Sequence, residues 1–197
     1  GTGNQYISMD ASASFEGMSL TNEVGEGTVT AGSDLRFMNS ELDFSTNAGE
    51  DTLVFAANDG YGLYLEGQDA YTDNIVLDFN GNGLSMKMGA LLDDYTYLHD
   101  VVMKDSVVIG SNAVHLHGDS AVVRGTLLND DMNSAYYLQA HTAFYNHGIV
   151  TNHNRGSLTI NAEQNVYNHG TWLNAGLQFT GTGNQSISMD ASASFEG

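Results

Sequence analysis

The nonapeptide FYNHGIVTN at residues 144–152 recurs 22 residues later as VYNHGTWLN at residues 166–174. A shorter match, GTLLN at residues 125–129, precedes them, and the glycines of the three segments lie 23 and 22 residues apart. Each segment joins a short apolar run to glycine and asparagine, the residues that tolerate tight turns. A fixed period of this length is typical of solenoids, in which each period forms one coil. The pattern therefore predicts a chain wound into coils of about 22 residues.

A coil of this length with several short strands predicts an all-β fold, the parallel β-helix or β-solenoid. Each strand then pairs with its equivalents in the coils above and below. The chain suits such pairing because it has no proline, so every residue keeps its backbone N–H donor. Apolar and polar residues alternate over residues 7–16, which is a strand pattern rather than a helical one. A β-sandwich is the alternative, because its strand spacing of roughly 8–12 residues also fits the first hundred residues.

The two ends of the chain carry nearly the same sequence. Residues 1–17 read GTGNQYISMDASASFEG and residues 181–197 read GTGNQSISMDASASFEG, so that only Tyr6 and Ser186 differ. We interpret residues 1–180 as one solenoid repeat unit, which at the shorter period would hold roughly eight coils. The stretch from Gly181 to Gly197 is then the start of a further tandem copy.

The repeated segment is predicted to form the joint at which copies stack. Its apolar residues should then lie at the two open ends of the unit. We expect the C-terminal pair to pack on the coil that contains Trp172, and the N-terminal pair to face a preceding copy. The residues concerned are Ile7, Met9, Ile187 and Met189.

The chain is strongly acidic, with 24 Asp and Glu residues against 5 Lys and Arg residues and a formal net charge of −19 at pH 7. Nucleic acids and anionic membrane surfaces would be repelled, so neither is an expected partner. No apolar segment is long enough to span a bilayer, so we expect no membrane insertion. The absence of cysteine excludes disulfides, thiolate catalysis and cysteine-ligated metals.

Asparagine recurs at matched positions of the short period. Stacked asparagines can join their side-chain amides in a hydrogen-bonded ladder that runs along a pile of strands. The spacing predicts two such columns. One holds Asn129, Asn152 and Asn174, and the other holds Asn146 and Asn168.

Two kinds of metal ligand occur in the sequence. Carboxylate and amide oxygens on turns suit Ca²⁺, and we predict its ligands among Asp78 and Asn80 or Asp130 and Asp131. His115 and His117 share one face of a strand, a spacing that can chelate zinc or copper, but the neighbouring sequence supplies no third ligand. A further pair, His147 and His169, is one period apart and should stack in adjacent coils.

The layout of residues 144–180, x-Tyr-Asn-His-Gly-x-x-x-Asn with a later Gly-x-Leu, resembles the repeats of filamentous-haemagglutinin-type adhesins and autotransporter passenger domains. The resemblance covers only this part of the chain. It implies a right-handed parallel β-helix on a bacterial cell surface or in a secreted fibre.

These features favour a structural role. We expect a module of a long extracellular bacterial fibre, stalk or sheath whose partners are further copies of itself, stacked end to end. The alternative is an adhesin module that presents tyrosine and asparagine to glycans or to another cell. A polysaccharide-active enzyme is the third option, because parallel β-helices include such enzymes. We expect no enzymatic activity, since active sites are rarely copied in long arrays and the sequence has no nucleophilic triad or phosphate loop.

Overall fold

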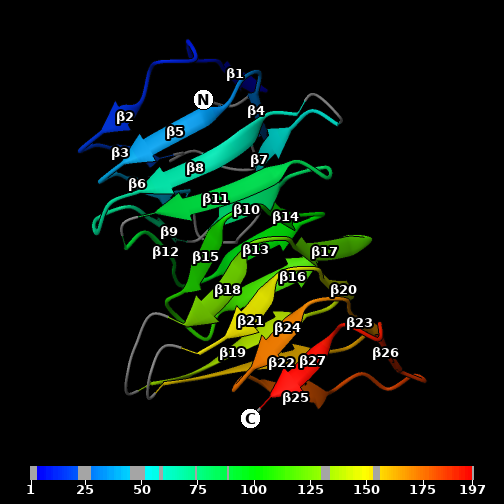
Figure 1. Ribbon diagram of the computed structural model, residues 1–197. Helices are drawn as coiled ribbons and strands as arrows, with labels where there is room; N and C mark the ends of the chain where they lie inside the picture. Colours follow the sequence, from blue (N-terminus) through cyan, green and yellow to red (C-terminus); the bar gives the residue numbers. More distant parts are fainter. Residues whose placement is uncertain are drawn as a thin grey trace.

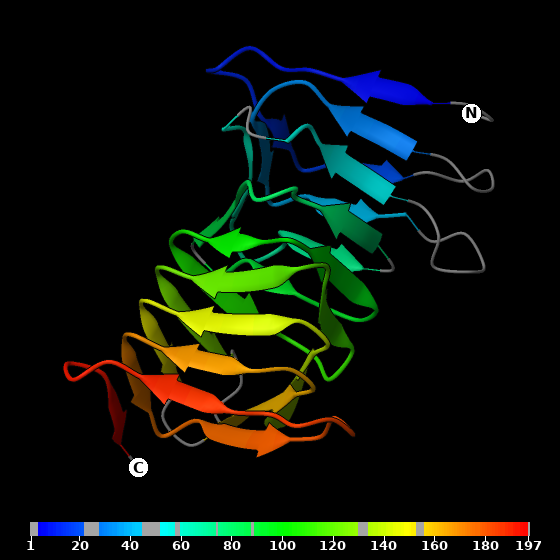
Figure 2. The same cartoon turned by 90° about the vertical axis from the view of Figure 1, so that its right-hand side faces the viewer.

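The computed structural model describes residues 4–21, 28–44, 52–57, 60–73, 75–87, 89–129, 134–152 and 156–196. Over these residues the chain forms 27 β-strands and no helix, and hence no helix that could cross a membrane. Three successive strands make one coil, and the coils pile up along one axis with the two ends of the chain at opposite ends of the pile (Figure 1, Figure 2). The predicted β-solenoid of about eight turns is therefore confirmed.

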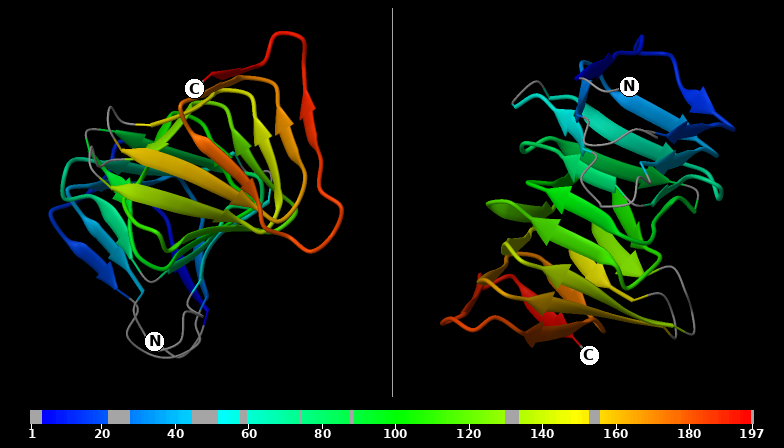
Figure 3. Two further views of the ribbon diagram at one scale, coloured as in Figure 1. Left: turned by 90° about the horizontal axis from the view of Figure 1, so that it is seen from below. Right: turned by 180° about the vertical axis from the view of Figure 1, so that it is seen from behind.

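The coils present three faces, each of nine strands that pair in parallel from coil to coil. Figure 3 shows the pile of coils from below and from behind. Face A is β1 (Gln5–Ile7), β4 (Thr28–Ala31), β7 (Thr52–Phe55), β10 (Ile75–Asp78), β13 (Thr96–His99), β16 (Val114–His117), β19 (Ala135–Ala140), β22 (Ser157–Ala162) and β25 (Gly176–Phe179). Face B is β2 (Phe15–Glu16), β5 (Leu35–Met38), β8 (Gly62–Glu66), β11 (Gly83–Lys87), β14 (Val102–Met103), β17 (Ser120–Val123), β20 (Ala143–Asn146), β23 (Val166–Asn168) and β26 (Ile187–Met189). Face C is β3 (Ser19–Thr21), β6 (Glu41–Asp43), β9 (Tyr71–Asp73), β12 (Leu91–Leu92), β15 (Ser106–Ile109), β18 (Thr126–Asn129), β21 (Ile149–Thr151), β24 (Thr171–Leu173) and β27 (Ser194–Glu196).

The core lies between the three faces and follows from the alternation within each strand. In β5, for example, Leu35 and Phe37 are fully buried, whereas Arg36 points outward. Side chains of like kind stack from coil to coil, as Phe55 and Phe79 do with ring centroids 5.4 Å apart and nearly parallel planes. The column of apolar side chains through the pile is continuous, so each coil is stabilised mainly by burial against its two neighbours.

The glycines that revealed the period occupy a column in which coils approach closely. A Cβ added at Gly148 would overlap the carbonyl oxygen of Gly125, and one at Gly170 would overlap that of Gly148. The paired residues that follow them confirm the register, since Thr126 lies opposite Ile149 and Ile149 opposite Thr171. Glycine recurs here because no side chain fits between successive backbones.

Coil length is less regular in the first two thirds of the chain. Along face A the register partners run in the order Val29, Leu53, Leu77, Leu98 and Leu116, and the step in sequence from each partner to the next becomes shorter toward the end of this series. The turns between the strands take up these differences, so the strands stay in register while the loops vary in length.

Candidate functional site

The last coil leaves apolar side chains uncovered at its end of the pile. β26 pairs with β23, so that Ile187 lies opposite the buried Val166, and β27 pairs with β24, so that Phe195 lies opposite the buried Trp172. Ile187 is 42% exposed and Phe195 is 40% exposed, although both continue columns that are buried one coil earlier. Among the described residues nothing covers them, so the last described coil presents an apolar surface with open strand edges.

The first coil forms the opposite end. Phe15 stacks on Phe37 of the second coil with ring centroids 4.9 Å apart, and Ile7 and Leu20 pack against the core while remaining partly exposed. Met18, on the turn between β2 and β3, is 45% exposed. Both ends of the pile therefore present hydrophobic side chains together with strand edges.

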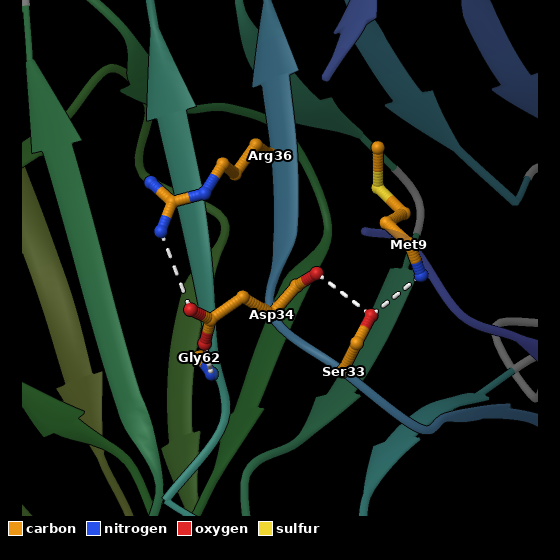
Figure 4. A network of polar contacts seen from close by, with 5 residues as sticks. All are labelled: Met9, Ser33, Asp34, Arg36 and Gly62. Atoms are coloured by element: carbon orange, nitrogen blue, oxygen red, sulfur yellow. Dashed lines mark hydrogen bonds and ion pairs between the residues drawn. The ribbon is translucent and has the colours of Figure 1, made fainter. Parts of the chain in front are cut away.

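Polar contacts link the first coil to the second and the second to the third (Figure 4). The N–H of Met9 donates to Ser33 Oγ at 2.7 Å, and Ser33 Oγ donates to the carbonyl oxygen of Asp34 at 2.9 Å. Asp34 in turn accepts the N–H of Gly62 at 2.9 Å and a hydrogen bond from Arg36 at 3.3 Å. The end coil is thus held by side chains as well as by its strand pairings.

The two copies of the repeated segment occupy different faces. Ile7 lies in β1 on face A, whereas Ile187 lies in β26 on face B. The local turn is the same in both, because the N–H of Ala13 donates to the carbonyl of Asp10 and that of Ala193 donates to the carbonyl of Asp190. The same turn therefore joins faces A and B in the first coil and faces B and C in the last.

The predicted joint residues are placed as follows. Ile187 and Met189 stack on the coil that contains Trp172, opposite Val166 and Asn168, and it is Phe195 that stacks on Trp172 itself, with ring centroids 5.2 Å apart. Ile7 and Met9 lie in the first coil and pack partly against the core. The positions at which the copies differ, Tyr6 and Ser186, are both exposed.

Asn146 and Asn168 form a buried pair on face B. They lie opposite each other in β20 and β23, and Asn146 Nδ2 donates to Asn168 Oδ1 at 2.8 Å. Asn168 Nδ2 continues to the carbonyl oxygen of Ser194 in the last coil at 3.0 Å. Both side chains are fully buried, so the amide pair ties together three successive coils.

The other three predicted ladder residues lie in different environments. Asn129 is fully buried at the end of β18, Asn152 is half-buried after β21, and Asn174 is exposed with a φ of 56°. Asn152 Nδ2 contacts the backbone carbonyl oxygen of Asn174 rather than its side chain. Asn152 Oδ1 accepts the N–H of Leu158 at 2.6 Å, so this asparagine supports a turn.

Of the two predicted pairs of calcium ligands, one lies at a turn and the other lies outside the described residues. Asp78 ends β10, and its Oδ1 accepts the N–H of Asn80 at 3.2 Å. Asn80, with a φ of 47°, donates its amide to the carbonyl oxygen of Phe55 at 2.8 Å. The side chains of this pair therefore stabilise the turn by hydrogen bonds to the backbone. Asp130 and Asp131 lie outside the described residues.

Face C carries a column of carboxylates in its second to fourth coils. Asp43 lies opposite Asp73. In the next coil Leu92 is paired with Thr72, so Asp93 follows at the position next to Asp73. Burial, and secondarily the adjacent aspartate, raise the pKa of Asp93. On the same face Tyr71 lies opposite Glu41, and a hydrogen bond with that carboxylate, aided by burial, raises the pKa of Tyr71 to about 12. This side of the solenoid therefore carries a strong negative charge.

Histidines gather where the sequence suggested only a pair. The predicted neighbours His147 and His169 stack in adjacent coils, with ring centroids 4.7 Å apart. His115 and His117 point outward from β16, and His141, which directly follows β19, joins them from the next coil. Sequence reasoning misses His141 because it lies far from His117 along the chain. A signal is nevertheless present, since that separation corresponds to one coil.

No protein-family model, no curated protein and no solved structure matches this chain. The features of the molecule that bear on function are the solenoid itself, its two apolar ends and its acidic and histidine-bearing faces.

Proposed function

We propose that this chain is a structural repeat module that lengthens a rod by end-to-end stacking of solenoid coils. The observation that carries the proposal is the pair of apolar ends. Phe195 and Ile187 continue the core columns of Trp172 and Val166, and a further coil would bury them as the inner coils are buried. The repeat of the N-terminal sequence at the C-terminal end supports a further copy as the partner.

The architecture gives such a module its length. Nine layers of strands rising about 4.8 Å per layer extend roughly 40 Å from the first coil to the last. Hydrogen bonds between coils run along the axis, so the rod resists stretching and bending. A net charge of −19 keeps neighbouring rods apart laterally, which favours growth at the ends. A place in an extracellular bacterial fibre, stalk or sheath accords with these properties and is part of the proposal.

Stacking is tested by removing the apolar character of one end. In Ile187→Asp and Phe195→Asp the chain keeps its inner coils but places a charge on the open surface. Sedimentation velocity of the unaltered chain over a concentration series should show elongated oligomers, and both variants should sediment as monomers. Tyr137→Asp is the matched control, because Tyr137 is 41% exposed on the side of the solenoid, in β19.

Two results would count against the proposal. One is an unaltered chain that stays monomeric over the concentration series while a chain with two successive copies scatters as two flexibly joined bodies. The other is loss of the oligomers in Tyr137→Asp to the same extent as in the end variants. A chain with two copies that behaves as one rigid rod of about twice the length would support the covalent form of stacking.

A glycan-binding adhesin module is the second candidate, favoured by a cleft on face B. The cleft holds about 210 Å³, and Arg36, Tyr64, Glu66, Ser85 and Lys87 contribute to its lining. The Arg36 guanidinium lies 4.2 Å from the centre of the Tyr64 ring. An aromatic ring beside guanidinium, carboxylate and hydroxyl groups suits the hydroxyl groups and apolar face of a sugar. Binding on a glycan array that Tyr64→Ala abolishes and Tyr137→Ala leaves intact would support this candidate. We propose no catalytic activity for either role.

A further inference from the structure

Three imidazoles converge on face A in the sixth and seventh coils. His115 and His117 project from the same side of β16, since the alternating residues Val114 and Leu116 are buried. The backbone places His141 beside them, because its N–H donates to the carbonyl oxygen of Leu116 at 2.9 Å. One ring nitrogen from each of the three histidines lies within 4.8 Å of those of the other two. Over the described residues this is the one group of three histidine, aspartate or glutamate side chains with such convergence.

The spacing of the ring nitrogens is close to that of a metal site. His115 Nδ1 and His141 Nε2 are 3.1 Å apart. Two imidazole nitrogens bound to one tetrahedral ion at about 2.0–2.1 Å would be about 3.3 Å apart. The rings of His115 and His141 are nearly parallel, at 2°, so binding requires each ring to rotate until its lone pair points at the ion. The χ2 torsion of histidine is broad, so half-buried side chains on an open face can make such rotations.

A carboxylate in the eighth coil orients one of the three rings. Glu163 Oε2 lies 3.0 Å from His141 Nδ1. An imidazole that gives its Nδ1 hydrogen to a carboxylate keeps a lone pair on Nε2, the atom that faces His115. Metal-binding histidines very commonly donate their second nitrogen to a carboxylate in this way. Glu163 is therefore a positioning residue, which selects the tautomer of His141 that can bind a metal.

The third ring carries an unused buried atom. His117 Nε2 is shielded from solvent and has no hydrogen-bond partner. Its ring is flanked by His99, at 5.1 Å between centroids, and by His141, at 4.5 Å. A buried nitrogen without a partner is uncommon, because desolvating a polar atom has an energetic cost unless a partner compensates it. A metal ion bound to this nitrogen would be such a partner.

We propose that His115, His117 and His141 form a binding site for one divalent transition-metal ion of the zinc, nickel or copper type. Neutral imidazole nitrogens suit these ions, whereas Ca²⁺ and Mg²⁺ prefer oxygen ligands. On binding, the ion takes the place of the proton between His115 and His141, and His115 carries its hydrogen on Nε2 instead. Three protein ligands leave a fourth position for water or for a group from another molecule. The ion would cross-link two coils, and Glu163 would connect it to a third.

The site is tested by titrating the full chain with ZnCl2 in isothermal calorimetry, with CaCl2 as the oxygen-preferring comparison. We expect one Zn²⁺ per chain, and binding at least ten-fold weaker in His141→Gln and His117→Gln. Glu163→Gln should weaken binding about ten-fold or more while keeping the stoichiometry, as expected for a positioning residue. The matched control is the double variant His147→Gln with His169→Gln, which removes another stacked histidine pair from adjacent coils. It should bind Zn²⁺ like the unaltered chain.

A second measurement keeps the test decisive if a variant fails to fold. X-ray absorption at the zinc edge of the unaltered, zinc-loaded chain should show imidazole ligands at about 2.0 Å. An oxygen-only shell would overturn the proposal, as would the absence of one-to-one binding. Equal loss of affinity in the His147→Gln, His169→Gln control would also overturn it. These outcomes are independent of end-to-end stacking, because the three histidines lie on the side of the solenoid, in its sixth and seventh coils.

Discussion

Replacing Asn168 with alanine should strongly destabilise the C-terminal coils. Its side chain is fully buried and makes three hydrogen bonds. It accepts from Asn146 Nδ2 at 2.8 Å, donates to the carbonyl of Ser194 at 3.0 Å and accepts the N–H of Gly170 at 3.3 Å. A buried hydrogen bond contributes about 1 kcal/mol, and a buried group left without a partner costs about 1–3 kcal/mol. Because Asn146 Nδ2 keeps a second acceptor in the carbonyl of Thr171, we expect a loss of about 3 kcal/mol.

The assay uses the single tryptophan of the chain as a local probe. Trp172 lies in β24, in the same coil as Asn168, and is buried. Its fluorescence in a urea titration therefore reports on these coils even if the solenoid unfolds in stages, as stacked repeats commonly do. In a double-mutant cycle with Asn146→Ala, the loss of stability in the double variant should be smaller than the sum of the two single losses by about 1 kcal/mol. This difference is the contribution of the hydrogen bond that the two asparagines share.

Asn161→Ala is the matched control. Asn161 is also a stacked asparagine, in β22, but it is half-buried. Its amide donates a long hydrogen bond of 3.3 Å to Gln139 Oε1, and its own Oδ1 has no partner. We expect the replacement to cost at most about 0.5 kcal/mol. The reasoning is refuted if Asn168→Ala shifts the free energy of unfolding no more than Asn161→Ala does, or if the cycle is additive.

Three further predictions concern single sites. Burial lowers the pKa of His117 from 6.5 to about 4, so between these pH values the unfolded chain binds more protons than the folded chain. In the presence of a chelator, the stability that His117 contributes should be complete above pH 6.5 and should decline by about 1–2 kcal/mol, after allowance for solvent screening, as the pH falls toward 4. The urea midpoint measured against pH should show this decline, and His117→Gln should flatten it. Gly170→Ala should lower stability by more than about 2 kcal/mol, because its Cβ would overlap the carbonyl of Gly148, and thermal unfolding unchanged from the parent chain would contradict the close packing of coils. Absorbance titration should show Tyr71 ionising near pH 12, and Glu41→Gln should bring its pKa down toward 10; a tyrosine spectrum insensitive to that change would disprove the hydrogen bond.

The coil period could be predicted from the sequence because stacking makes equivalent residues face one another. Gly148 and Gly170 lie in one column because the backbone of the neighbouring coil leaves no room for a side chain. Asn146 and Asn168 lie in another column because their side-chain amides hydrogen-bond to each other. Such requirements act between nearest neighbours and repeat at every coil, so they appear in the sequence as spacings of about 22 residues. Strand alternation adds the inward and outward positions.

The convergence of His115, His117 and His141 could not be predicted in the same way. Coils in that region differ in length, and which residues meet across coils depends on the lengths of all the turns between them. For the same reason Ile7 and Ile187, in nearly identical segments, lie on different faces. The sequence alone determined the class of fold, the period and the existence of repeated ends, because these depend on local pairing rules. The tertiary structure decided which face each segment occupies and which side chains meet there, because turn lengths accumulate along the chain.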